Sequence, residues 1–440
     1  MSGARSLSRR RFNALLAACL SSSAGLRSAD GISPQPPLAV AVDAPSLKVR
    51  AGLVIELLER HIETGYLIGA VALIGHRARA EAVSVGEQSV FATRLMQRDS
   101  LFRITSMTAP ITAAATLMLV DEGKLRLAEP IDSWLPELAH RHVLRHPSGL
   151  LEDTVRAQRP ITVEDLLSSR CGLGIAANAA EDSPMQRRIA DLRLVGFGAP
   201  DPASPMSPDE WLRRLGTLPL MAQPGETWLD RTSSCILGVL ISRIAHKPLP
   251  VVLTERVFAP LGMRDTAFTV PASKRERLVS AYRLEAGRLW PYDDPATSPW
   301  MSAPAFPDGS SGLVSTLDDL FAFSGFLLTQ GHPALARLLS ANAVIDMTRD
   351  RLTPAQRANA APLIGNHRGW GFGLGVITET TPEGIPAGAC GSNGGFGTSW
   401  VADPSSGTSA ILLTQTLFNS AMPPAVHQEF WSAVFSPPVV

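Results

Sequence analysis

The stretch from Leu101 to Leu138 constrains this chain most, because it places a serine at the start of a long apolar helix. Residues 102–104 have the pattern of a short strand, and Ser106 follows them. An apolar run then continues to Gly123, and glycine is typical just after a helix C-terminus. A serine at such a strand-to-helix transition is a typical nucleophile position. We therefore expect Ser106 to begin the helix of a functional site.

The composition is that of a globular protein with a large core. Hydrophobic residues make up 45% and charged residues 18% of the 440 residues, and the formal net charge is +0. This length allows two or three domains. Because nucleic acids require a basic surface, the neutral balance predicts no nucleic-acid partner.

The N-terminal segment has the pattern of an export signal. Residues 8–12 read SRRRF, and the weakly apolar residues 13–26 follow, a stretch too short to span a bilayer as a stable helix. This order predicts a twin-arginine export signal over residues 1–30 and a linker over residues 31–47. The mature protein is then expected to be periplasmic or secreted. A disordered basic tail is the alternative interpretation.

Cys19 raises a second alternative for the N-terminal segment. Residues 16–19 read LAAC and resemble a bacterial lipoprotein box, so Cys19 is a candidate lipid anchor. No later run of eighteen apolar residues follows, and we expect no transmembrane helix in the mature chain. Export would leave three cysteines, of which at least one stays unpaired or pairs between chains. These are Cys171, Cys235 and Cys390.

Strand patterns lie at both ends of the chain, and helical patterns lie in the middle. Alternation predicts strands at Ala70–Gly75, Ala82–Gly86, Gly371–Ile377, Gly397–Asp403 and Ser409–Thr414. Helical periodicity predicts helices at Leu53–Tyr66, Ile161–Leu167, Asp209–Leu215, Cys235–Ala245, Leu253–Phe258, Asp318–Thr329 and Val426–Phe435. Thr162 and Ser207 are the expected N-caps of two of these helices.

This order predicts an α+β fold in which a sheet formed by the two chain ends carries an inserted helical lobe. Residues 48–100 and 310–436 are expected to form the sheet domain. Residues 101–309, which carry the serine, are expected to form a mainly helical domain. The cleft between the domains is the expected site. We expect its walls to come largely from the insertion at residues 178–208 and from loops near residues 292–308.

Four segments resemble the class C β-lactamase-related serine hydrolases, a family that includes esterases. They are Pro160–Leu167, Gln223–Trp228, Val257–Met263 and Gly312–Thr316. The resemblance covers most of residues 48–436. It implies a β-lactamase/transpeptidase-like fold with an antiparallel sheet flanked by helices. The implied partner is a small-molecule ester, amide or cell-wall fragment in the interdomain cleft, and we expect no cofactor and no metal.

The first motif of this family is S-x-x-K, in which a lysine one helical turn after the serine accepts its hydroxyl proton. The corresponding residues here are Ser106, Met107, Thr108 and Ala109. Ser106 occupies the nucleophile position, whereas the methyl group of Ala109 cannot take up a proton. The nucleophile is therefore present and the general base is missing.

The second family motif supplies a tyrosine, often within W-x-Y, which carries a proton between the nucleophile and the leaving group. Trp228 matches its start, but Asp230 stands at the tyrosine position and Arg231 follows. One hypothesis is that Asp230 acts as an unusual base toward Ser106, with Arg231 holding it. We favour a solvated or structural Asp–Arg pair, since a carboxylate near its ordinary pKa is a weak proton acceptor.

The third motif reads K-T-G, H-x-G or W-x-G in relatives and lies on the strand beside the nucleophile. Ser392 stands at its first position here, and Gly394 and Gly395 follow. The glycines of the motif are thus kept, although its first side chain is changed. The backbone amides of Ser106 and Gly395 could therefore form an oxyanion hole. Cys390 is an alternative nucleophile, but a buried, inert thiol is the favoured interpretation.

Changes at three motifs favour natural loss of catalysis over a single laboratory substitution at Ala109. The leading hypothesis is an exported, catalytically degenerate protein of serine hydrolase fold whose cleft retains ligand binding. The alternative is an active serine esterase or β-lactamase-type hydrolase that uses Ser106 through an acyl-enzyme with a non-standard base. A structural or partner-binding role is the third hypothesis. Metal binding is a weaker alternative, which rests on His140, His142 and His146.

Overall fold

The computed structural model describes residues 44–77, 79–177, 183–328 and 338–436. The expected export signal over residues 1–30 and Cys19 lie outside this part of the chain. The expected linker over residues 31–47 lies outside it as far as residue 43. Its last four residues already belong to helix α2 (Ala44–Glu63).

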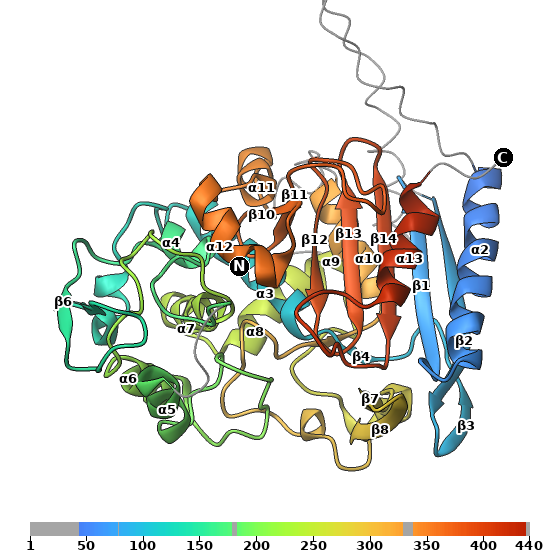
Figure 1. The fold of residues 1–440 in the computed structure, drawn as a ribbon, viewed down its shortest axis with the longest axis horizontal. Coiled ribbons are helices and arrows are strands. Elements are labelled where there is room, and N and C mark those ends of the chain that lie inside the picture. Colours follow the sequence, from blue (N-terminus) through green and yellow to red (C-terminus); the bar gives the residue numbers. More distant parts are fainter. Residues whose placement is uncertain (1–43, 78, 178–182, 329–337, 437–440) are drawn as a thin grey trace, which may run out of the picture.

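An eight-stranded antiparallel sheet is assembled from both ends of the chain, in the order β10-β11-β12-β13-β14-β1-β2-β3 (Figure 1). Its strands are β1 (Gly69–His76), β2 (Arg79–Ser89), β3 (Ala92–Leu95), β10 (Arg368–Trp370), β11 (Gly375–Ile377), β12 (Cys390–Gly394), β13 (Thr398–Asp403) and β14 (Thr408–Thr414). The two ends join where β1 pairs with β14, with Ala70 opposite Thr414. The expectation of one sheet from both chain ends is confirmed.

Helices cover both faces of this sheet, and the sequence of β1 explains why. Its even-numbered residues 70–74 pack into one apolar cluster with α2 and α13 (Ala425–Phe435). Its odd-numbered residues 71 and 73 pack into a second cluster with α10 (Leu317–Leu328). Because successive strand residues point to opposite faces, an uninterrupted apolar run produces a strand that is buried on both sides.

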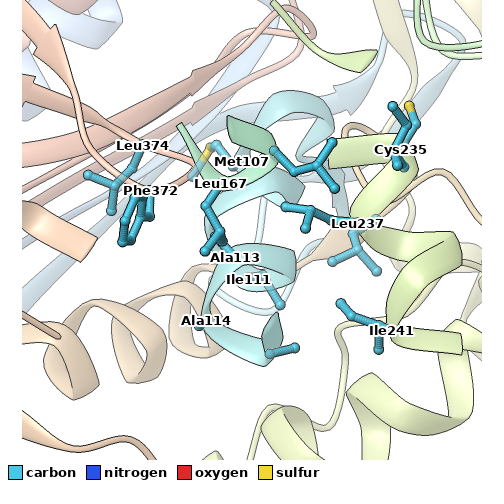
Figure 2. Close-up of a cluster of buried hydrophobic side chains, with 14 of the residues drawn as sticks. Met107, Ile111, Ala113, Ala114, Leu167, Cys235, Leu237, Ile241, Phe372 and Leu374 are labelled. Carbon is cyan, nitrogen blue, oxygen red and sulfur yellow. The ribbon is translucent and has the colours of Figure 1, made fainter. Parts of the chain in front are cut away.

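Helix α3 (Thr108–Asp121), the expected helix after Ser106, lies within the largest hydrophobic cluster of the described residues. Every residue from Thr108 to Leu119 is buried. Figure 2 shows α3 between Leu237 of α7 (Thr232–Ala245) on one side and Phe372 on the other. A helix that is apolar all round requires such complete coverage. Its position is therefore fixed by packing along its whole length.

The other helices lie mainly in the inserted lobe and beside the C-terminal strands (Figure 1). They are α4 (Val163–Leu167), α5 (Pro184–Asp191), α6 (Pro208–Leu215), α8 (Leu249–Leu253), α9 (Ala259–Leu261), α11 (Ala341–Thr348) and α12 (Pro354–Ile364). Thr162 caps α4 in a capping box with Asp165, and Ser207 caps α6 by accepting from the Glu210 amide. Both predicted caps are confirmed, as short-range hydrogen bonding makes them readable from sequence.

Several elements differ from the prediction. The strand expected at Gly371–Ile377 begins only at Gly375, as β11, because residues 371–374 form the turn that joins it to β10, with Gly373 at φ +73°. The helix expected at Leu253–Phe258 is a π-helical turn over Thr254–Phe258 between α8 and α9. Four short paired strands were not expected: β5 (His142–Leu144), β6 (Thr154–Arg156), β7 (Ala281–Glu285) and β8 (Arg288–Asp293).

No single helix within the described residues has the length and apolar composition to cross a bilayer. Only α7 taken together with residues 249–261 meets those two criteria, and this pair is bent by 81°.

His427 is a fully buried titratable group between α13 and the sheet. Its Nδ1 lies 2.8 Å from Ser399 Oγ, and its ring packs edge-on against Phe418 at 5.0 Å. Burial lowers the pKa of His427 to about 3, and the positive charge of His61 acts in the same direction. The ring is therefore neutral in the folded protein at neutral and mildly acidic pH.

We expect this histidine to make the protein less stable as pH falls from 7 to 4. The unfolded chain takes up a proton at His427 near pH 6.5, whereas the folded chain does so only near pH 3. The effect should reach up to about 3 kcal/mol of unfolding free energy at pH 4. Urea unfolding at several pH values should show a flatter pH dependence for His427→Gln. The exposed control His146→Gln should keep the native slope, and equal slopes in all three proteins would contradict the assignment.

Candidate active site

Ser106 lies where a short strand gives way to the central helix, as predicted. Strand β4 (Phe102–Arg103) pairs with β9 (Val314–Ser315), and the Ile104 amide donates to the Leu313 carbonyl at 3.0 Å. Residues 105–107 form one 3-10 turn before α3. Thr105 has φ +39°, which is strained for a β-branched residue. This fixed, strained entry leaves Ser106 half-buried at the wall of a pocket.

Ala109 lies at the start of α3, one turn after Ser106. It is only 9% exposed and does not line the pocket. A Cβ atom on Gly373 would lie 2.9 Å from the Ala109 carbonyl oxygen, so the β10–β11 turn packs directly on this part of the helix. The base position is therefore occupied by a small apolar group within the packed core.

Strand β12 packs against the residues around Ser106. The Ser392 hydroxyl donates to the Ser106 carbonyl at 3.2 Å. A Cβ atom on Gly394 would lie 2.7 Å from Thr105 Oγ1 and closer still to the Ile104 carbonyl oxygen. Only glycine permits this approach. The contact brings the third motif beside the serine.

Gly395 lines the same pocket as Ser106. Its carbonyl accepts a hydrogen bond from the Phe418 amide at 2.9 Å, which fixes the residue beside the loop that follows β14. Its neighbour Gly394 lies behind the pocket wall. The two amides expected to form an oxyanion hole, those of Ser106 and Gly395, thus belong to walls of one cavity.

Hydrogen bonds from two backbone segments fix the main chain at Asp230. It exchanges two 3.0 Å hydrogen bonds with Ile175, and the Thr232 amide donates to its carbonyl at 3.0 Å. The intervening Arg231 has φ +71° and ψ −59°, so residues 230–232 form the rare γ-turn with positive φ. Such strain persists only where surrounding bonds enforce it. Here it turns the chain from the second motif directly into α7.

The Asp230 carboxylate is paired only loosely with Arg231. The Arg231 Nε lies 3.8 Å from its Oδ2, and Arg231 also donates to the Gly198 carbonyl. Burial raises the pKa of Asp230, while the Arg231 charge and a backbone hydrogen bond oppose the rise. A raised pKa makes a carboxylate a better proton acceptor than an exposed one.

Five of the seven predicted site residues line one cavity of about 220 Å³: Ser106, Asp230, Arg231, Ser392 and Gly395. The other walls were not anticipated. They come from the end of α12, from Arg368 and Trp370 of β10, and from the loop at residues 418–423. No described residue of the insertion at 178–208 or of the loops at 292–308 lines the cavity, so that expectation is wrong.

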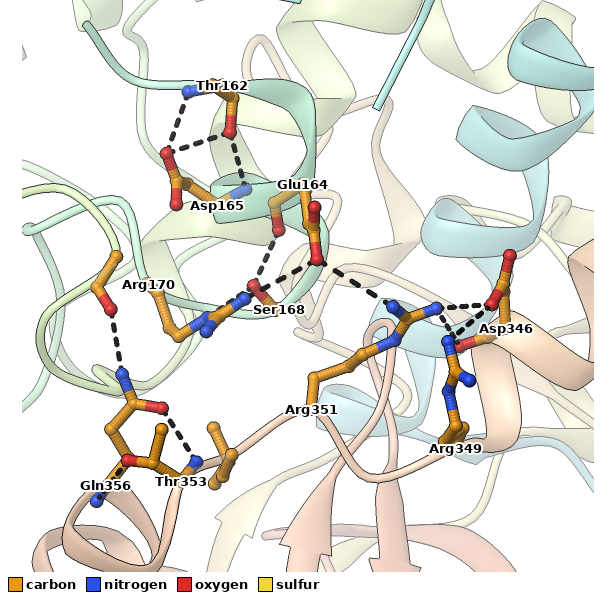
Figure 3. A network of polar contacts seen from close by, with 12 residues as sticks. Thr162, Glu164, Asp165, Ser168, Arg170, Asp346, Arg349, Arg351, Thr353 and Gln356 are labelled. Atoms are coloured by element: carbon orange, nitrogen blue, oxygen red, sulfur yellow. Dashed lines mark hydrogen bonds and ion pairs between the residues drawn. The ribbon is translucent and has the colours of Figure 1, made fainter. Parts of the chain in front are cut away.

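A polar network around α4 and the start of α12 is shown in Figure 3, and the end of α12 lines the cavity. Arg351, in the loop between α11 and α12, lies 2.6 Å from Asp346 of α11 and 3.8 Å from Glu164 of α4, and so joins these two helices. Gln356, which completes the capping box of α12, also donates to the Gly225 and Glu226 carbonyls at 2.8 and 3.0 Å. These bonds attach α12 to the second-motif segment. The cavity wall is therefore rigidly connected to the helical lobe.

The three described cysteines are free and buried. Cys390 is 1% exposed and is absent from the cavity lining. Burial raises the pKa of its thiol to about 12, so it is neutral and unreactive at physiological pH. The alternative of Cys390 as nucleophile is therefore wrong. Within the described residues no three metal-ligating side chains come together, including those around His142.

Comparisons with known proteins show which family the chain belongs to. A family model described as Beta-lactamase matches residues 54–428. An uncharacterized protein of Mycobacterium tuberculosis (strain CDC 1551 / Oshkosh) is 38% identical over 366 residues, covering 80% of this chain and 87% of its own length. Esterase EstB of Burkholderia gladioli is 30% identical over 418 residues, covering 88% of this chain and 95% of its own.

Solved structures establish the fold. The structure of EstCE1, a hydrolase with promiscuous acyltransferase activity, matches with a TM-score of 0.75 at 25% identity. It covers 89% of this chain and 100% of that one. The unliganded simvastatin synthase of Aspergillus terreus matches with a TM-score of 0.69 at 20% identity, covering 88% and 98%. The expected β-lactamase/transpeptidase-like fold is confirmed.

Two adjacent glycines provide a matched test of the β12 contact. We expect Gly394→Ala to destabilise the protein by about 1–3 kcal/mol or more, because the new methyl group meets backbone that cannot yield. Gly395→Ala should be tolerated, since no atom lies within 4 Å of its added Cβ. Urea unfolding of both variants measures the difference. Equal unfolding free energies for the two variants would show that β12 can move away from residues 104–106 without loss of stability.

Proposed function

The chain belongs to the Beta-lactamase family, and we propose that it is an exported, catalytically degenerate member whose cleft binds a small ester, amide or cell-wall fragment. The observation that carries this proposal is the pairing of Ser106 in the cavity wall with the methyl group of Ala109 at the base position. A serine hydroxyl without a base is a weak nucleophile.

The cavity offers little to replace the missing base. No lysine, histidine or tyrosine occurs among the described residues that line it. Asp230 is the one carboxylate there, and its partner Arg231 lies on the same wall. The backbone amides remain beside Ser106, so an acyl oxygen can still be held. Binding is thus better supported than turnover.

The names of similar proteins and the apolar wall of the cavity indicate the class of ligand. Two of the similar proteins are named as an esterase and as a hydrolase with acyltransferase activity, which supports an ester or a related acyl compound. Trp228 and Trp370 pack edge-to-face behind the cavity at 5.1 Å and give it an apolar wall. Export by the twin-arginine route rests on the pattern of residues 8–26 alone.

We expect the unaltered protein not to be labelled at Ser106 by a fluorophosphonate probe or by a penicillin, as read by intact-mass spectrometry. The Ala109→Lys variant should gain labelling by roughly 10²–10⁴-fold, because a general base contributes a factor of that size. Ala109→Met, similar in length but without an amine, should remain unlabelled.

Three outcomes separate the hypotheses. Labelling of Ser106 in the unaltered protein would reveal an active base and overturn catalytic loss. No labelling of the lysine variant would mean that the second and third motifs have also lost their catalytic function. Failure of every ester, amide and penicillin to raise the melting temperature would favour the structural or partner-binding role over ligand binding.

A working hydrolase is the second candidate, and one observation favours it. Burial raises the pKa of Asp230, and this carboxylate lines the same cavity as Ser106. A carboxylate of raised pKa is a stronger base, and its ionised form increases as pH rises through that pKa. Turnover by this route would therefore increase as pH rises through the raised pKa of Asp230.

We expect Asp230→Asn to leave ester turnover at the level of the unaltered protein, close to the uncatalysed background. 4-Nitrophenyl acetate hydrolysis between pH 4 and 8 measures it, with Ser106→Ala as the control for reaction at other sites. A drop of tenfold or more in Asp230→Asn, together with loss of the rise in turnover with pH, would establish Asp230 as the base.

A further inference from the structure

Arg368 is a charged residue of the cavity that none of the family motifs contains. It extends from β10, the edge strand of the sheet, into the cavity that Ser106 also lines. Its guanidinium carbon lies 5.4 Å from the ring centroid of Trp431 in α13. No hydrogen bond or ion pair joins its side chain to any other described residue, whereas Arg231 contacts both Asp230 and the Gly198 carbonyl.

The surroundings of Arg368 are unfavourable for an unpaired cation. Burial lowers its pKa to about 10, and the charge of Glu383 offsets only part of this effect. The guanidinium remains charged at neutral pH. Arg368 is half-buried, and a cation that loses part of its water is costly unless a counter-ion or hydrogen-bond acceptors replace that water. The Trp431 ring replaces some of that stabilisation but accepts no conventional hydrogen bond.

The charges of the cavity do not balance. Asp230 and Arg231 offset each other, which leaves Arg368 as the uncompensated charge. One excess positive charge calls for a monoanion, because the described cavity lining has no further cation to offset a second negative charge. A planar guanidinium matches the two oxygens of a carboxylate in a bidentate pair.

We propose that Arg368 binds a carboxylate of the ligand, so that the cavity takes small monoanionic esters or amides in preference to neutral ones. This inference rests on the proposed ligand-binding function and adds the charge of the ligand to it. The acyl group would lie toward Ser106 and Gly395, and the carboxylate toward β10. Arg368 is then a specificity residue that takes no part in proton transfer.

A matched pair of ligands tests the assignment. Monobenzyl glutarate and benzyl methyl glutarate differ only in a methyl group that masks the carboxylate. Titrations followed by ligand-detected NMR should show that the unaltered protein binds the acid about 10- to 100-fold more tightly, the range expected for a charge-assisted hydrogen bond. Arg368→Gln should remove most of this preference by weakening the binding of the acid far more than the binding of the diester. Arg368→Lys should keep part of it.

The controls distinguish the role of Arg368 from the proposed ligand binding in general. Arg213→Gln removes an exposed arginine of α6 outside the cavity and should keep the native preference. The melting temperature of each variant without ligand verifies the fold. Equal affinity for the two ligands, or a preference that persists in Arg368→Gln, would overturn the role of Arg368 while ligand binding stands. Binding of neither ligand to the unaltered protein would overturn the proposed function and this inference together.

Discussion

The close packing of β12 against residues 104–106 is the constraint on which the site depends. It joins Ser392 to Ser106, which are 286 residues apart in sequence, and it is possible because Gly394 has no side chain. The contact is made largely by backbone and small groups. It therefore does not require the lysine and tyrosine of the family motifs. This explains how the cavity can keep its form after the proton-transfer side chains have changed.

Two strained residues lie next to polar residues of the cavity wall. Thr105 with φ +39° precedes Ser106, and Arg231 with φ +71° follows Asp230. Each such conformation costs of order 1–3 kcal/mol and persists only where neighbouring bonds enforce it. The paired bonds of Asp230 with Ile175 and the bond from Ile104 to Leu313 supply that enforcement. Both turns aim a polar residue at one cavity, so they serve its shape whichever chemistry it supports.

Local patterns explain what could be predicted from the sequence. The apolar runs of β1 and β14 predicted a sheet from the two chain ends, and Thr162 and Ser207 predicted helix starts through hydrogen bonds that span three residues. The family motifs predicted that Ser106 and Asp230 would meet. Each of these signals is either short in range or carried by residue types with one dominant structural role.

The missed features depend on contacts between distant segments. The cavity wall from α12 and β10 exists because Gln356 bonds to residues 130 and 131 positions earlier, which no periodicity reveals. Cys390 was not missed in this way, since the favoured interpretation of a buried, inert thiol agrees with its burial. Arg368 has a ring contact with Trp431 but no hydrogen bond or ion pair among the described residues, and no sequence motif indicates this arrangement.

The charges of the cavity connect the loss of the base with the ability to bind. In the family pattern the first motif supplies a lysine and the second an uncharged phenol, whereas this chain has the methyl group of Ala109 and the carboxylate of Asp230. Both changes make the cavity more negative. Arg231 offsets the new carboxylate, and Arg368 leaves one positive charge in excess. In the proposed function, proton transfer and anion binding would rely on different side chains, so the first could be lost while the second is kept.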